Sequence, residues 1–313
     1  MPDGWSRRRG RDVALGCVLA LTATLGTGCG GGARRPAGAV PVLTETTASP
    51  AGTTGAQAGA GASATASGPG APTLAKPGSG NQRGARPTHA ALAGALSGRV
   101  VTVDPGHNGG NFTHPEQIGH LVNDGDGLKE CDTTGTAAAD GYRETDFNWD
   151  VGLRVRALLQ RAGARVVMTR HSNSGVGPCI TERAAIGNRA HSDVAISIHA
   201  DGGPPAGSGF AVLVPAPIPS GANSMIIRPS RRLAVDLRSA LEAIGLHTST
   251  YEGANGIAPR TNLGGLNLSR VPKVFVEVAN MRNAADEAPM ERPAYRQHVA
   301  EALLAGIERF LEG

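Results

Sequence analysis

Val101–His107 reads VTVDPGH, an apolar run that ends in a turn and a histidine. Two later segments follow the same plan, VAISIHAD at 194–201 and VFVEVAN at 274–280. Each segment is short and rich in β-branched residues, which predicts a buried strand. The carboxyl ends of strands in open α/β sheets form the ligand crevice, so we expect His107, His199 and Glu277 to meet there. Two imidazoles and a carboxylate are typical of a catalytic zinc site.

Strands and helices alternate along the rest of residues 99–313. Apolar residues at helical spacing predict helices over 146–163, 180–190, 231–244 and 295–311, and further strands are predicted over 99–103, 165–169 and 210–214. This alternation predicts an α/β fold: a three-layer-like single domain with a twisted, mostly parallel sheet flanked by helices. Residues 108–143, rich in Gly, Asp and Thr, and residues 245–270 lack clear periodicity and are expected to be loops. A loop as long as 108–143 is usually functional or disordered.

The first 98 residues differ in composition from the rest. Residues 1–28 carry four arginines and then an apolar stretch from Val13 to Leu25, which is typical of an export signal. The apolar stretch is too short for a comfortable membrane span. Small residues before Cys29 make this cysteine a candidate for lipidation, and with it a membrane tether. Residues 29–98 are mostly Ala, Gly, Pro, Ser and Thr, so we expect a disordered linker.

The basic excess of the chain lies outside the predicted domain. The formal net charge is +4, but residues 1–28 contribute +2 and residues 29–98 contribute +4, which leaves −2 for residues 99–313. The domain also lacks a basic patch with interleaved aromatic residues. The sequence therefore argues against a nucleic-acid partner.

Two of the four cysteines, Cys131 and Cys179, fall in the predicted domain. An exported protein with two such cysteines favours a disulfide between them. In the chain-entropy model, closing that loop stabilises the fold by about 4 kcal/mol. Neither residue belongs to a CxxC pair, which disfavours the alternative of a cysteine-ligated zinc site.

A zinc hydrolase needs a third protein ligand in addition to two histidines. Glu144 is our first choice, because it precedes the helix at the point where the 108–143 segment returns to the core. The residues alone do not exclude four other candidates: Asp104, His114, His120 and Asp201.

At these positions the sequence resembles the zinc-dependent N-acetylmuramoyl-L-alanine amidases of the Amidase_3 type, over roughly residues 99–312. The resemblance is carried by an ordered set of motifs: VDPGH at 103–107 with Gly109-Gly110, Glu144 and the following helix, Thr169-Arg170, Arg183 with Ala190 and Asp193, SIHA at 197–200, Pro272, Val276-Glu277, Asn280 and Asn283. It implies that His107, Glu144 and His199 bind Zn²⁺ and that Glu277 is the catalytic carboxylate. Two features depart from the family pattern: residues 108–143 are a long insertion that could cover the groove, and Asp201 stands where Asn is common.

The reaction implied by the resemblance is hydrolysis of the amide between N-acetylmuramic acid and L-alanine. The partner is then peptidoglycan or a muropeptide, met in the periplasm or cell wall by an exported protein, which we expect to be a monomer. Asp104 is a candidate acceptor that orients His107, and its alternative role is that of a turn residue before Pro105. Arg260 is a candidate contact for a carboxylate of the peptide, and its alternative is an ordinary surface arginine.

Two alternatives remain open from the residues. Another exported zinc amidohydrolase, such as a carboxypeptidase or deacetylase, would keep the same metal ligands and differ in its groove. A non-catalytic wall-binding module on the same fold would be expected to have lost a ligand or the base, and all four positions are intact.

Overall fold

The computed structural model describes residues 94–313. The predicted signal, Cys29 and most of the predicted linker therefore lie outside the described residues. The packed domain begins slightly before the predicted boundary at residue 99. Leu96 is buried, and its amide donates to the carbonyl of Ala162.

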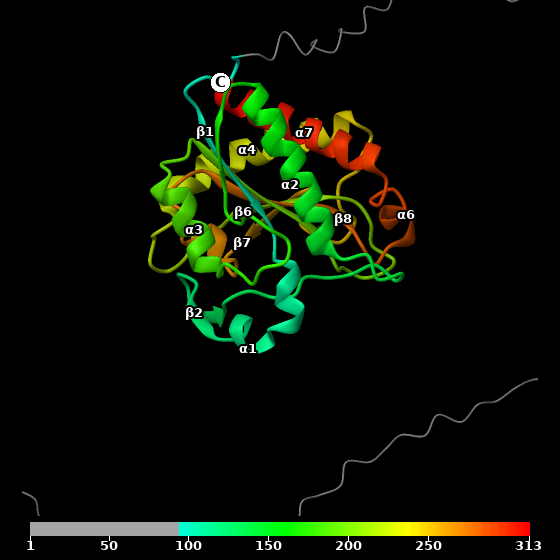
Figure 1. The fold of residues 1–313 in the computed structure, drawn as a ribbon. Coiled ribbons are helices and arrows are strands. Elements are labelled where there is room, and N and C mark those ends of the chain that lie inside the picture. Colours follow the sequence, from blue (N-terminus) through cyan, green and yellow to red (C-terminus); the bar gives the residue numbers. More distant parts are fainter. Residues whose placement is uncertain (1–93) are drawn as a thin grey trace, which may run out of the picture. The chain divides into compact units, whose positions relative to one another are not determined.

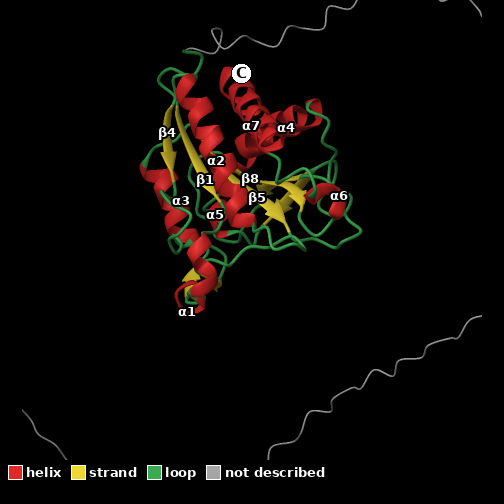
Figure 2. Cartoon of the chain, turned by 45° about the vertical axis from the view of Figure 1, so that its right-hand side comes forward, coloured by secondary structure: helices red, strands yellow, loops and turns green. Residues whose placement is uncertain are grey.

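The domain has three layers, as predicted (Figures 1 and 2). The central sheet has the order β4-β1-β5-β8-β6-β7 and is parallel except that β6 runs antiparallel to β8. Its strands are β1 (Val100–Pro105), β4 (Arg165–Met168), β5 (Val194–Asp201), β6 (Ala211–Pro215), β7 (Ile257–Arg260) and β8 (Lys273–Asn280). Helices α2 (Glu144–Arg161), α4 (Ser224–Ala243) and α7 (Pro293–Glu312) pack on one face. Helices α3 (Ile180–Arg189) and α5 (Gly264–Asn267) pack on the other, and α6 (Ala284–Glu287) follows β8.

Residue alternation along the central strands gives the two faces of the sheet different chemistry. Val101, Val103, Ile196 and Ile198 join the apolar core with residues of α2. The intervening residues face α3 and α5, and they include Thr102, Asp104, Ser197 and Lys273, all buried. Because strand side chains alternate with a period of two, His199 and Glu277 follow Ser197 and Lys273 onto this polar face.

The 108–143 insertion is folded rather than irregular. It contains a 3₁₀ helix η1 (Gly109–Thr113), the short helix α1 (Pro115–Ile118) and a hairpin of β2 (Leu121–Asn123) and β3 (Leu128–Glu130). In Figure 1 it lies below the sheet, at the carboxyl end of β1. Elements this short do not produce the apolar periodicity that identifies longer ones, so the sequence did not reveal them.

Helix α4 begins earlier than predicted. The expected start at residue 231 was wrong, because the helix already begins at Ser224 and contains Pro229. An amide at position 229 would donate to the carbonyl oxygen of Met225, an exposed residue in the first turn of the helix. Proline therefore removes one hydrogen bond at the beginning of α4. Among the described residues, no helix combines the length and the apolar character that a membrane span requires.

Candidate metal centre and active site

His107 lies in the turn that follows β1. Its backbone has a φ of 54°, in the left-handed region that few residues other than glycine adopt. Such a conformation costs on the order of 1–3 kcal/mol and is found most often at functional sites. Arg183 holds the turn by donating to the His107 carbonyl oxygen over 2.8 Å. The conformation directs the imidazole towards the ends of β5 and α2.

Glu144 is the first residue of α2, so its carboxylate lies at the helix N-terminus. Oε2 accepts a hydrogen bond from the backbone amide of Thr136 at 2.9 Å, and Oε1 accepts one from Asn148 Nδ2 at 3.1 Å. The amide of Ala200 also donates to Oε1, over 3.3 Å. These contacts fix the carboxylate between the insertion and the end of β5.

His107, Glu144 and His199 converge on one point. Glu144 Oε1 lies 3.5 Å from His107 Nε2 and 3.0 Å from His199 Nδ1. One ligand atom from each residue lies within 4.8 Å of the others, and the two imidazole rings meet edge-on with centroids 4.9 Å apart. Two imidazole nitrogens and a carboxylate oxygen form a donor set that suits zinc and leaves a fourth position for water or substrate.

The charge state of Glu144 suits metal binding. Burial alone would raise its pKa, but the adjacent His107 and His199 outweigh that and lower the pKa to about 2. Burial lowers the pKa of His199. It also lowers that of His107, but there Glu144 and Asp132 reverse the effect and the pKa is raised. Glu144 is therefore ionised, which is the form in which a carboxylate binds a cation.

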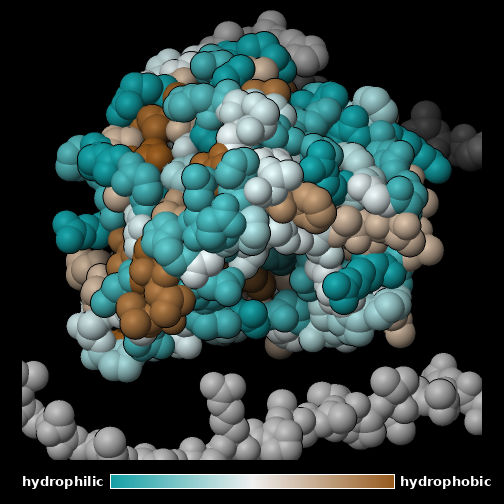
Figure 3. Space-filling model, turned by 60° about the horizontal axis from the view of Figure 1, so that its bottom comes forward, coloured by the Kyte–Doolittle hydropathy of each residue, from teal (hydrophilic) through white to brown (hydrophobic). Residues whose placement is uncertain are grey.

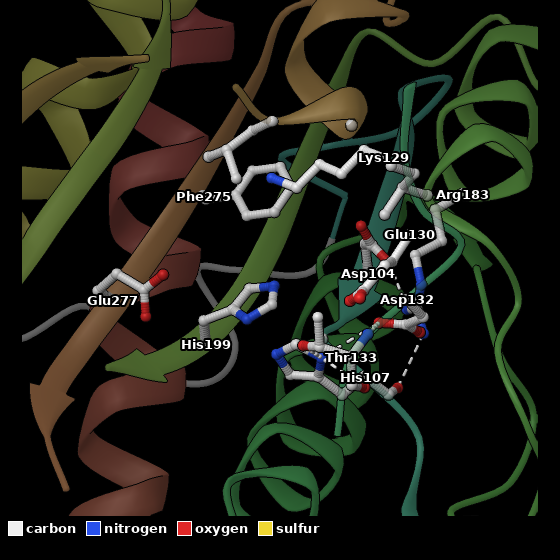
Figure 4. A pocket seen from close by; sticks show the side chains of 14 residues that line it. Asp104, His107, Lys129, Glu130, Asp132, Thr133, Arg183, His199, Phe275 and Glu277 are labelled. Atoms are coloured by element: carbon white, nitrogen blue, oxygen red, sulfur yellow. Dashed lines mark hydrogen bonds and ion pairs between the residues drawn. The ribbon is translucent and has the colours of Figure 1, made fainter. Parts of the chain in front are cut away.

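Glu277 lies directly beside His199 in the sheet, since the two residues are register partners in β8 and β5. Figure 4 shows its carboxylate directed toward the His199 ring. No hydrogen bond or ion pair engages this carboxylate within residues 94–313. Burial raises its pKa, the charges of Glu144 and Asp201 raise it further, and Arg260 acts in the opposite direction. A carboxylate held in this way can both accept and return a proton.

Two hollows meet at these side chains. A cavity of about 200 Å³ is lined by His107, His199 and Glu277 together with Phe275 and residues of the insertion hairpin. A more open hollow of about 580 Å³ shares the same three residues and extends along Thr136, Ala137, Gly202 and Arg282. Figure 3 views the molecule from the side on which the carboxyl ends of the strands lie. A substrate can thus reach His107, His199 and Glu277 together.

Asp104 does not orient His107, so that expectation was wrong. Its carboxylate points to the polar face of the sheet, where it accepts hydrogen bonds from Thr169 (2.6 Å), Arg183 (2.9 Å), Lys273 (2.9 Å) and Ser197. Burial acts to raise its pKa, but Lys273 and Arg183 outweigh it, and the pKa lies well below the usual value. The pleat of β1 directs the Asp104 side chain to the polar face of the sheet, whereas His107 lies in the turn that follows the strand. The residue therefore neutralises two buried cations.

Sequence reasoning missed Asp132, which occupies the place expected for Asp104. Asp132 Oδ1 lies 3.1 Å from His107 Nδ1. The residue belongs to the insertion, in a stretch without periodicity and 25 positions from His107, so no local pattern joins the two. Its neighbour Cys131 was the one available signal, because a disulfide at that position ties the segment to the core.

The remaining predicted residues lie at several different places in the fold. Cys131 and Cys179 form the predicted disulfide, with a Cα–Cα distance of 4.4 Å. Arg260 is paired with Glu252, whose Oε1 lies 3.1 Å from its Nη1. Of the rival metal ligands, His114 bonds the Gly110 carbonyl and His120 lies beside the disulfide. Asp201 lines the open hollow and accepts a hydrogen bond from Tyr251 at 2.8 Å.

Comparison with known proteins identifies a family. Residues 101–309 match the family model described as N-acetylmuramoyl-L-alanine amidase. An N-acetylmuramoyl-L-alanine amidase of Mycobacterium tuberculosis is 41% identical over 217 residues, which cover 69% of this chain and 88% of that protein. The crystal structure of the amidase Ami1 from Mycobacterium smegmatis is 44% identical, with a TM-score of 0.65 over 69% of this chain and 98% of the other. The apo crystal structure of Ami1 from Mycobacterium abscessus is 43% identical, with a TM-score of 0.65 over 69% and 100% of the two chains.

Proposed function

The chain belongs to the N-acetylmuramoyl-L-alanine amidase family, and on that premise we propose that it hydrolyses peptidoglycan at a zinc site formed by His107, Glu144 and His199. The bond cleaved is the amide between N-acetylmuramic acid and the L-alanine of the stem peptide. The observation that carries the zinc assignment is the convergence of two imidazole nitrogens on one ionised carboxylate oxygen, with Glu277 beside them.

Zinc bound by these three side chains would supply Lewis-acid chemistry, lowering the pKa of water and polarising the scissile carbonyl. We propose Glu277 as the general base. It takes a proton from the attacking water as the new C–O bond forms, then gives the proton to the nitrogen of L-alanine as the C–N bond breaks. The products are the carboxylate of the lactyl group and a stem peptide with a free amine.

The site supports amidase chemistry over the two alternatives. A non-catalytic wall-binding module has no need for a poised carboxylate, and Glu277 stands beside the ligands with a raised pKa. The family and its relatives are amidases, which disfavours a carboxypeptidase or deacetylase.

We further propose that residues 1–28 direct export, that residues 29–98 form a linker and that Cys29 is lipidated. The protein would then act as a monomer in the periplasm or cell wall.

The test is mass spectrometry of purified muropeptides after incubation with the purified protein. Three samples are compared: untreated protein, protein stripped with a chelator, and stripped protein to which zinc is restored. We expect free stem peptide in the first and third samples only. Release that persists after metal removal would contradict the zinc assignment. If folded, zinc-loaded protein releases nothing from any muropeptide, amidase activity itself is refuted.

A further inference from the structure

The insertion supplies a buried carboxylate to a metal-ligating histidine. His107 Nδ1 lies 3.1 Å from Asp132 Oδ1 and 3.2 Å from the Thr133 carbonyl oxygen. A third neighbour of Nδ1, the Thr133 hydroxyl at 3.2 Å, can donate or accept, whereas the Asp132 carboxylate and the Thr133 carbonyl oxygen only accept. The proton of a neutral His107 therefore belongs on Nδ1. That tautomer leaves the lone pair on Nε2, the nitrogen that faces Glu144.

Asp132 is itself held from two directions. Its second oxygen, Oδ2, accepts a hydrogen bond from Arg183 at 3.1 Å. Arg183 is 5% exposed and also bonds Asp104 and the His107 carbonyl oxygen, so one guanidinium ties Asp132 to the end of β1 (Figure 4). The preceding residue, Cys131, is joined to Cys179 immediately before α3, and its carbonyl accepts the amide of Ile180 at 2.7 Å.

The two histidines of the site are held differently. His199 stacks on Phe275, with ring centroids 5.1 Å apart and an interplanar angle of 17°. Within residues 94–313, the one carboxylate that forms a hydrogen bond or ion pair with its ring is Glu144, which is itself a ligand candidate. The geometry of His107 therefore depends on a charged residue at Nδ1, the nitrogen opposite the one that faces Glu144, and the geometry of His199 depends on packing against Phe275.

We propose that Asp132 is a positioning residue for His107, and that the Cys131–Cys179 disulfide keeps it in place, so that the insertion sets the zinc affinity of the site. A carboxylate on the far nitrogen fixes the ring and raises the basicity of the ligating nitrogen. The inference rests on the proposed zinc site. It assigns the insertion a part in metal binding that is independent of any contact with substrate.

The test measures zinc affinity by competition with a chromophoric chelator, in the purified protein and in Asp132→Asn. The amide still accepts a hydrogen bond but has lost the charge. Loss of such a partner typically weakens metal binding by about 10- to 100-fold, and we expect a weakening in that range. The visible absorption spectrum of the cobalt-substituted protein should shift as well, since it reports the ligand field directly.

Asp193→Asn is the matched control. Asp193 accepts a hydrogen bond from the Val100 amide at 2.7 Å and pairs with Arg99, away from the metal ligands. It should lower the melting temperature without changing zinc affinity or the cobalt spectrum. Equal losses of affinity in the two variants would mean general destabilisation and would overturn the proposal, as would unchanged affinity in Asp132→Asn.

The double variant Cys131→Ser/Cys179→Ser tests the second half of the proposal. We expect zinc affinity to fall in the same direction as in Asp132→Asn, and wild-type affinity would refute the part assigned to the disulfide. A wild-type protein that binds no zinc would refute the proposed zinc site itself. Zinc binding that is tight and indifferent to Asp132 would refute this inference alone.

Discussion

The imidazole of His199 occupies the space that a side chain at position 106 would require. A Cβ built on Gly106 would lie 2.1 Å from His199 Cε1 and 2.5 Å from Nδ1, both far inside van der Waals contact. The glycine of the VDPGH segment is therefore needed for close approach. It lets the turn after β1 pass under the His199 ring of β5, and it accounts for the contact between two segments that lie far apart in the sequence.

Gly106→Ala is expected to displace the His199 ring and reduce amidase activity by about 100-fold, the scale associated with a 1 Å misplacement of a catalytic group. Zinc affinity should fall as well. Gly187→Ala is the matched control, because the nearest atom to a Cβ there, Thr102 Oγ1, is 3.6 Å away. Amidase activity and zinc affinity are measured for both variants. Full activity in Gly106→Ala would contradict the packing argument.

Glu277→Gln should lose activity by about 10²- to 10⁴-fold, the usual contribution of a general acid–base group. The amide cannot accept the proton of water. Since Glu277 is outside the proposed triad of ligands, zinc content should stay at the wild-type value. Peptide release and metal analysis are measured on the same samples. The control is Glu242→Gln on the exposed side of α4, which should behave as wild type. Zinc loss in Glu277→Gln would instead identify the residue as a ligand.

Glu144→Gln should abolish the stabilisation of the protein by zinc. A ligand that binds only the folded state raises stability by about 2.7 kcal/mol at a hundredfold excess over its dissociation constant. Wild-type protein should thus show a melting temperature that rises with added zinc. The variant loses the charged oxygen that faces both imidazoles, so its melting curve should respond little. An undiminished zinc-dependent rise would exclude Glu144 from the metal site.

Asp104 should make the fold sensitive to acid. Its pKa in the folded state lies below the unfolded value of about 3.9, so its carboxylate contributes stability above that pH. The contribution is lost as pH falls from about 4 through the folded pKa. Melting temperatures from neutral pH down to about pH 2 test this against Asp104→Asn.

The variant leaves Lys273 and Arg183 without their shared anion, so it should be less stable at neutral pH by about 3–5 kcal/mol. Below about pH 4 the difference from wild type should narrow. Other acidic groups titrate in both proteins, which is why the difference between the two curves is the measured quantity. Parallel curves over the whole range would contradict the role assigned to Asp104.

Much of the site could be predicted because it lies at strand ends. VTVDPGH, VAISIHAD and VFVEVAN each identify a buried strand, and the rule that parallel strands present their carboxyl ends together brings His107, His199 and Glu277 to one edge. The prediction of Glu144 as the third ligand was weaker, because four other residues were candidates for this place until the family resemblance favoured Glu144. Its position in the first turn of α2 is what the fold adds.

Tertiary structure alone decided which charged groups surround the candidate ligands. The sequence by itself determined the layers, the main helices and five of the six strands of the central sheet, because periodicity and burial are local properties of the chain. It missed β7 and α5 in residues 245–270, which were expected to be loops, and these elements are only four residues long each. It did not determine that Asp132 faces His107, that Asp104 neutralises Lys273 and Arg183, or that Glu252 engages Arg260. Each of these contacts joins segments whose approach depends on the path of a turn or an insertion. Such a contact stabilises the fold without producing any periodic pattern of residue types in the sequence.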